Sequence, residues 1–134
     1  MPGTAPVAFQ GGSFPAYAKA ITDQESGGRY GIANTQGSGA MGIVQTMPET
    51  TKALAARLGV AYRPDLMAGT TPEAMAYQNQ LGNASLQDDW KFGGGDPRRA
   101  AYHHFAGPNQ GGWGPKTRQY GNDILGRMSR MGNR

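Results

Sequence analysis

The sequence predicts a compact, mainly α-helical domain with long glycine-rich loops. Two observations support this prediction. Apolar residues recur at spacings of three and four in several segments, as they do along one face of an α-helix. No segment keeps the alternation of a strand for more than a few residues, and no repeat of fixed period is present. The 22 glycines and 9 prolines stand between the periodic segments, so we expect short helices and long ordered connections.

Start and stop signals place five helices along the chain. They are expected at Phe14–Ser26, Met47–Leu58, Thr71–Phe92, Arg98–Phe105 and Thr117–Met128. Ser13, Thr71 and Asp96 are suited to cap the first, third and fourth helices, because their side-chain oxygens can accept a hydrogen bond from the first turn. Gly59 and Gly93–Gly95 are expected to end the second and third helices, although a glycine within the third weakens it.

The chain length of 134 residues fits one domain with a substantial core. We expect a flexible N-terminal arm at residues 1–12, the domain itself at 13–128 and a basic C-terminal tail at 129–134. A net charge of +4 and a pI near 9.6 suit an anionic partner such as nucleic acid, a membrane surface or an acidic cell-wall polymer. The basic residues form no block and do not alternate with aromatic residues, so no nucleic-acid partner is expected.

Several classes of site and location are disfavoured by what the sequence lacks. There is no cysteine, which excludes disulfides and thiolate chemistry. No apolar run approaches the roughly 20 residues that span a bilayer, so no membrane insertion is expected. Residues 1–12 lack the basic start and apolar centre of a secretory signal. A protein of this kind that acts outside the cytoplasm would need another route of delivery or a larger parent chain.

Glu25 is the candidate catalytic residue. It lies four residues after Ile21, at the end of an apolar stripe on the first predicted helix, and Gly27 and Gly28 follow it. A carboxyl at the end of an apolar face is partly withdrawn from water, which favours its protonated form. Such a carboxyl can act as a general acid. The alternative at this stage is an ordinary solvated glutamate in a last helical turn.

Four short motifs follow one another along the chain. They are Glu25–Gly27, Ser38–Gln45 with Met47–Thr50, Ala101–Tyr102 with Ala106–Pro108, and Thr117–Tyr120. Together they resemble the lytic transglycosylase (SLT) domain, whose fold is similar to goose-type lysozyme, and the resemblance covers about residues 13–128. It implies a lysozyme-like helical domain in which glycine-rich loops surround a glycan cleft.

The resemblance also implies an activity, that of a peptidoglycan lytic transglycosylase. Enzymes of this family cut the β-1,4 bond between N-acetylmuramic acid and N-acetylglucosamine with a single glutamate. The glutamate protonates the glycosidic oxygen and then takes the proton of the muramoyl 6-hydroxyl, which attacks C1 and leaves a 1,6-anhydro end. This scheme departs from the two-carboxylate rule for glycoside hydrolysis. Glu25 matches the family's glutamate.

Five further residues are predicted to bind substrate. Gln45 matches the motif glutamine that lines the sugar site, where an amide can donate to and accept from sugar groups. Tyr102 matches the motif tyrosine near the catalytic carboxyl, and Tyr120 the tyrosine of the last motif. Asn34 stands near a polar position that stabilises the developing sugar charge. Trp113 could stack on a sugar face. The alternatives are a loop-stabilising glutamine for Gln45 and structural packing for the three aromatic rings.

The third motif departs from the family pattern Ala-Tyr-Asn-Ala-Gly. His103 replaces the asparagine, and two residues are inserted before Ala106. No metal or cofactor is expected, because adjacent helical residues point about 100° apart and the chain has no other histidine and no cysteine. We expect the histidines to be exposed or to anchor a loop. Asp88–Asp89 is expected to be a solvated helical face, and Asp96 a helix cap, so no second carboxylate is placed to hold a water.

Three other functions remain as alternatives. They are a hydrolytic muramidase acting on the same bond, a catalytically silent glycan-binding structural module and, more distantly, a basic nucleic-acid binder. The expected partner is the peptidoglycan strand, and the expected place of action is the periplasm or cell wall. Residues 26–28 and 113–115 resemble phage-tail or other wall-penetrating versions of the domain. That resemblance implies delivery by a virion, a secretion machine or a larger parent protein.

Overall fold

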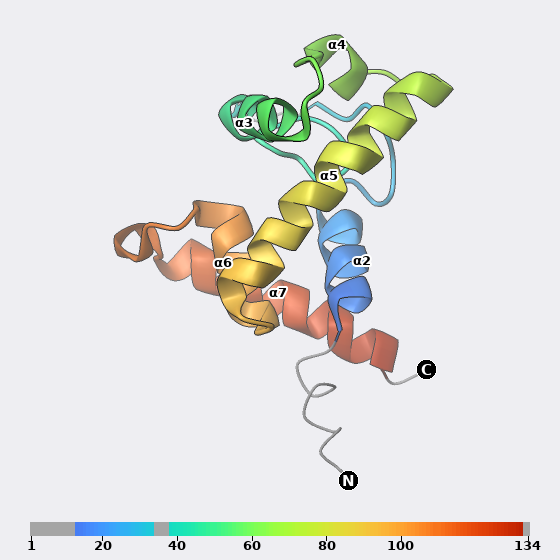
Figure 1. The fold of residues 1–134 in the computed structure, drawn as a ribbon. Coiled ribbons are helices and arrows are strands. Elements are labelled where there is room, and N and C mark those ends of the chain that lie inside the picture. The colour runs from blue at the N-terminus through green and yellow to red at the C-terminus, as the bar shows by residue number, and fades with distance from the viewer. Residues whose placement is uncertain (1–12, 34–37, 133–134) are drawn as a thin grey trace, which may run out of the picture. The chain divides into compact units, whose positions relative to one another are not determined.

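The computed structural model describes residues 13–33 and 38–132, and within these ranges the protein is built from helices (Figure 1). They are α2 (Phe14–Glu25), α3 (Pro48–Leu58), α4 (Pro64–Met67), α5 (Pro72–Gly93), α6 (Pro97–Ala106) and α7 (Pro115–Gly132), with a short 3-10 turn η1 (Gln110–Gly112). The β-type pairing in the described residues is limited to isolated bridges. The mainly α prediction is confirmed. None of the helices described is long and apolar enough to cross a membrane.

The three predicted helix caps are confirmed by their local hydrogen bonds. Ser13, Thr71 and Asp96 each accept a hydrogen bond from a backbone N–H of the first helical turn, at 3.3, 3.1 and 2.9 Å respectively. Gly59 ends α3 in the left-handed conformation, with φ of 74°, which glycine adopts without steric cost. These boundaries are set by short-range chemistry, which is why sequence patterns locate them.

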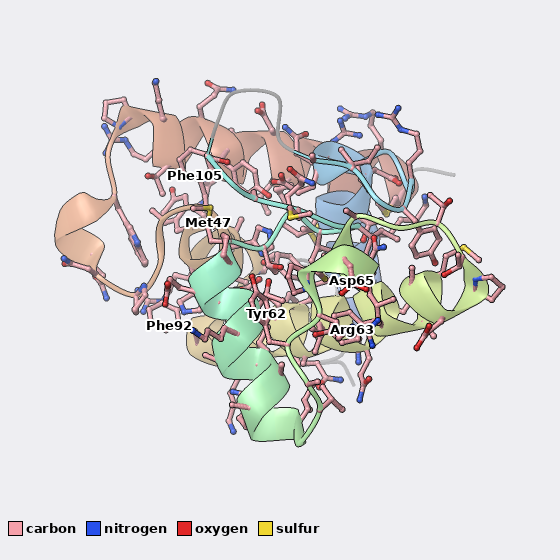
Figure 2. The ribbon with its side chains drawn as sticks, turned by 90° about the horizontal axis from the view of Figure 1, so that it is seen from above. Met47, Tyr62, Arg63, Asp65, Phe92 and Phe105 are labelled. Atoms are coloured by element: carbon pink, nitrogen blue, oxygen red, sulfur yellow. The ribbon has the colours of Figure 1, made fainter. Side chains whose placement is uncertain are left out.

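Two elements differ from the prediction. Residues 60–70, where no helix was predicted, contain α4, which begins at Pro64. An exposed ion pair between Arg63 and Asp65, 2.8 Å apart, spans the start of this helix. Figure 2 shows these two side chains together at the start of α4. The last helix runs to Gly132 and not to Met128. Its apolar stripe ends at Met128, but no helix-breaking residue occurs before Gly132.

The chain divides into two compact units. Unit 1 contains the described residues of 1–21 and 86–134, and unit 2 contains those of 22–85. Both boundaries fall inside helices, one in α2 and one in α5, so no linker marks them. Residues 1–12, the predicted N-terminal arm, lie outside the described residues. Each unit has its own buried side chains and is considered separately below.

The core of unit 2 joins α3, α4 and the first part of α5. Its buried members are Leu54, Ala55, Leu66, Met67, Ala74, Tyr77, Leu81 and Ala84. Gln78, which is fully buried, connects this core to the loop after α2. Its Nε2 donates to the carbonyls of Leu66 and Gly69 at 2.8 and 2.9 Å, and its Oε1 accepts from the Gly31 N–H at 3.0 Å. Both polar atoms of this buried amide are therefore hydrogen-bonded, and they join the loop after α2 to the segment at the end of α4.

Gly82 lies inside α5, where glycine costs roughly 1 kcal/mol relative to alanine. A Cβ at this position would lie 3.3 Å from Val44 Cγ2 and 3.5 Å from Ile43 Cγ2. The missing side chain therefore lets the second motif lie directly on α5. Packing of the second motif against α5 therefore explains why Gly82 is present inside a helix that it weakens.

Replacing Gly31 with alanine is expected to lower the free energy of unfolding by about 3 kcal/mol. Its φ is 71°, and a Cβ would lie 2.9 Å from the backbone oxygen of Gly69, which cannot swing aside. Gly28 has a similar φ of 84°, but a Cβ there would meet nothing within 4 Å. Gly28→Ala should therefore cost only the backbone strain, about 1 kcal/mol. Chemical denaturation of both variants makes the comparison, and equal losses would contradict the close packing at Gly31.

Candidate functional site

Glu25 is the last residue of α2, one position before the predicted end of the helix, and it is half-buried. The residue after it is fixed in place. Ser26 is 2% exposed, its Oγ donates to the Ile43 carbonyl at 2.7 Å, and the same Oγ accepts from the Gly28 N–H at 3.1 Å. The Ser26 hydroxyl therefore ties the backbone that carries Glu25 to the second motif. Both segments belong to unit 2.

Gln45 lies in the second motif with φ of 54°, a left-handed conformation that is uncommon for residues other than glycine. Its Nε2 donates to the carbonyls of Ile32 and Gly42 at 2.8 and 3.0 Å. The amide nitrogen therefore stabilises the loop, which agrees with the alternative interpretation of Gln45 as a loop-stabilising residue. Its Oε1 is the acceptor of the amide, and a role of this atom in binding a sugar remains a prediction. Backbone strain of this kind tends to occur at functional sites.

Tyr102 and Trp113 meet in unit 1, and both are half-buried. Their rings are 5.1 Å apart and nearly perpendicular, the edge-to-face arrangement that aromatic pairs favour. The indole N–H of Trp113 donates to the Gly107 carbonyl at 2.9 Å. Its ring also lies 5.6 Å from the guanidinium of Arg99 and 6.1 Å from the ring of Phe92. These are packing contacts, and sugar stacking by Trp113 remains a prediction.

Tyr120 is 6% exposed and packs against α6. Its ring stacks on Phe105 at 4.9 Å and lies parallel to His104 at 6.3 Å. Phe105, labelled in Figure 2, belongs to the departure in the third motif and is 47% exposed. The contacts of Tyr120 are those of a residue that supports α6. Asn34 lies outside the described residues.

Asp89 is buried, so the prediction that Asp88–Asp89 forms a solvated helical face was wrong for this residue. It is 2% exposed. The Nδ1 atoms of His103 and His104 lie 2.7 and 2.8 Å from its two oxygens, and the hydroxyl of Tyr17 donates to it at 3.2 Å. The expectation for the histidines was also wrong, since neither is exposed and both bind a carboxylate on helix α5. The side chains of adjacent helical residues diverge by about 100°, but His103 and His104 can still bind one carboxylate because each uses a different oxygen of Asp89.

Electrostatics keep this buried carboxyl ionised. Burial by itself would raise the pKa of Asp89, but the charge of His104 and hydrogen bonds from His103 and His104 outweigh burial and hold the pKa below its ordinary value. We name these four side chains, Tyr17, Asp89, His103 and His104, the Asp89 cluster. A sequence signal for the burial of Asp89 existed, because Asp89 follows the apolar residues Leu86 and Leu81 by three and eight positions, which places it on their side of the helix.

The model of the Transglycosylase SLT domain matches residues 8–111. The chain therefore belongs to the SLT transglycosylase family. A protein described as a transglycosylase, from Enterobacteria phage PRD1, is 32% identical over 111 residues, which cover 83% of this chain and 36% of that protein. The chain thus spans about a third of the length of this relative. No solved structure matches the chain significantly.

Proposed function

We propose that this chain is a peptidoglycan lytic transglycosylase in which Glu25 is the catalytic acid and then the catalytic base. The observation that carries the proposal is the family match over residues 8–111, which includes the Glu25 motif. The setting of Glu25 supports it, because the residue is half-buried and its backbone is fixed through Ser26. A general acid needs a defined position relative to the bond it cleaves.

In the proposed reaction, Glu25 gives its proton to the oxygen that joins N-acetylmuramic acid to N-acetylglucosamine. The C1–O bond breaks and C1 takes on positive character. The carboxylate then accepts the proton of the muramoyl 6-hydroxyl, whose oxygen forms the new bond to C1. The products are a free 4-hydroxyl on one fragment and a 1,6-anhydro ring on the other. Gln45 would use its Oε1 to accept a hydrogen bond from a sugar hydroxyl or acetamido N–H.

The contacts of Asp89 and Asp96, two acids that could have held a hydrolytic water, support a scheme with a single carboxylate. Asp89 is held by the histidines of the Asp89 cluster, and Asp96 caps α6. These contacts favour transglycosylation over the hydrolytic muramidase, which needs a second carboxylate to activate water. The relative from a phage supports delivery to the cell wall by a virion or within a larger parent protein. The peptidoglycan strand is the proposed partner.

Mass spectrometry of soluble fragments released from purified peptidoglycan tests this proposal. The expected fragments end in 1,6-anhydro-muramic acid and carry no added water. Fragments with reducing ends, each one water heavier, would identify a hydrolase. If no fragments were released by the active-site-intact protein, a glycan-binding module would be the better account.

A further inference from the structure

We propose that Arg98, Gly121 and Asn122 are positioning residues that fix the ring and the hydroxyl of Tyr102 for glycan binding. This inference rests on the proposed function and on the role in substrate binding that the sequence predicts for Tyr102. We call the three residues the Tyr102 seat. Arg98 precedes Tyr102 by one turn of α6, while Gly121 and Asn122 are consecutive residues of α7. Figure 1 shows α6 and α7 lying against each other.

The tyrosine ring occupies the space where a side chain at position 121 would be. A Cβ built on Gly121 would overlap Tyr102 Cε1 and would lie 3.1 Å from Cδ1. Gly121 is buried and has an ordinary helical backbone, so it is not needed for an unusual φ. A glycine inside a helix costs roughly 1 kcal/mol relative to alanine. Contact with the ring is therefore the reason for glycine at this position.

The hydroxyl of Tyr102 is held by a guanidinium that is itself anchored. Arg98 Nη1 donates to the Tyr102 hydroxyl at 3.4 Å and to Asn122 Oδ1 at 2.8 Å. Arginine has no acceptor, so the tyrosine oxygen must accept this hydrogen bond. The O–H group of Tyr102 therefore does not donate to Arg98, and it can donate a hydrogen bond to a sugar oxygen. The edge contact with Trp113 supports the ring from a third element.

Gly121→Ala and Gly126→Ala form a matched pair on α7. A Cβ at Gly126 would meet only the flexible end of Arg130, at 3.5 Å, so this control should keep the wild-type kcat/KM on solubilised glycan strands. Gly121→Ala should displace the Tyr102 ring and lower kcat/KM by at least about tenfold, which corresponds to loss of one well-placed hydrogen bond. Equal kcat/KM values for the two variants would overturn the proposal.

A double-mutant cycle tests the hydroxyl contact without relying on the packing of Gly121. Arg98→Met keeps the aliphatic stem and removes the guanidinium, and it should lower kcat/KM by about fivefold to tenfold. In a Tyr102→Phe background, which has no hydroxyl, Arg98→Met should have no further effect. Additive losses in the cycle would mean that Arg98 acts independently of Tyr102, and this outcome would also overturn the proposal.

Aromatic-ring NMR of Tyr102 provides a readout that does not depend on catalysis. The ring resonances should shift in Gly121→Ala, because the ring leaves its position beside Trp113, and should remain in place in Gly126→Ala. Unchanged ring resonances in Gly121→Ala would contradict the proposal that the Tyr102 seat fixes this ring, even if the enzyme were active. Failure of the proposed function is recognised separately, by the absence of anhydro fragments from the wild-type protein.

Discussion

Replacing Glu25 with glutamine is expected to reduce the release of anhydro-muramoyl fragments by about 10²- to 10⁴-fold, the usual contribution of a general acid–base group. Glutamine has nearly the same shape as glutamate, but it cannot give a proton to the glycosidic oxygen or accept one from the 6-hydroxyl. The change of one atom thus removes both proposed roles at once. The measurement is the initial rate of fragment release, followed by mass spectrometry.

The matched control for this variant is Glu49→Gln, at an exposed position in the first turn of α3. It should retain the wild-type rate, and both variants should unfold at nearly the same temperature as the wild type. A fully active Glu25→Gln protein would show that another group supplies the proton. A large loss of thermal stability in Glu25→Gln alone would instead mean that this carboxylate has a structural role.

Asp89→Ala is expected to lower the free energy of unfolding by about 3–5 kcal/mol, the range for removing one partner of a buried ion pair. The substitution leaves three polar groups of the Asp89 cluster without their common acceptor. Chemical denaturation near pH 6 measures the loss. Asp65→Ala, which breaks the exposed ion pair with Arg63, should change stability little, because such pairs are weak in water.

The pH dependence of this loss follows from the direction of the pKa shift. The pKa of Asp89 is lower in the folded protein than in the unfolded chain, because the charge of His104 and the two histidine hydrogen bonds outweigh burial. Its ionised form therefore stabilises the fold above roughly pH 4, and this contribution is lost as the pH falls through the lowered pKa. The difference between wild type and Asp89→Ala should be smaller at pH 3 than at pH 6. An equal difference at both pH values would contradict the assignment.

Local chemistry explains which parts of the fold were predicted from the sequence. The caps at Ser13, Thr71 and Asp96 depend on one or two neighbouring backbone groups, so sequence patterns locate them. Asp89 was misplaced because its identity suggested a solvated face, whereas its helical register placed it inward. Its partners His103 and His104 come from another helix, and no short-range pattern predicts that pairing.

The same distinction applies to the candidate site. Short motifs drew attention to Glu25, Gln45 and Tyr102, and the roles of these residues in catalysis and binding remain proposals. The supporting contacts were not predicted. Gly121 carries no motif signal, and its importance is visible only when the ring of Tyr102 is seen to occupy the position of its missing side chain. Residues that position others are selected by tertiary packing, which has no fixed spacing along a sequence.

The Asp89 cluster also constrains the order in which the chain can complete its contacts during synthesis. Tyr17 and Asp89 are 72 positions apart, and the histidines are made later still. The beginning of α2 therefore emerges from the ribosome long before its unit 1 partners exist. Unit 2 is one continuous segment, 22–85, so every residue that it needs is available before α6 has been made. The proposed acid, Glu25, belongs to the unit that can be completed first, whereas Tyr102 belongs to the unit that must wait until α6 and α7 have been made.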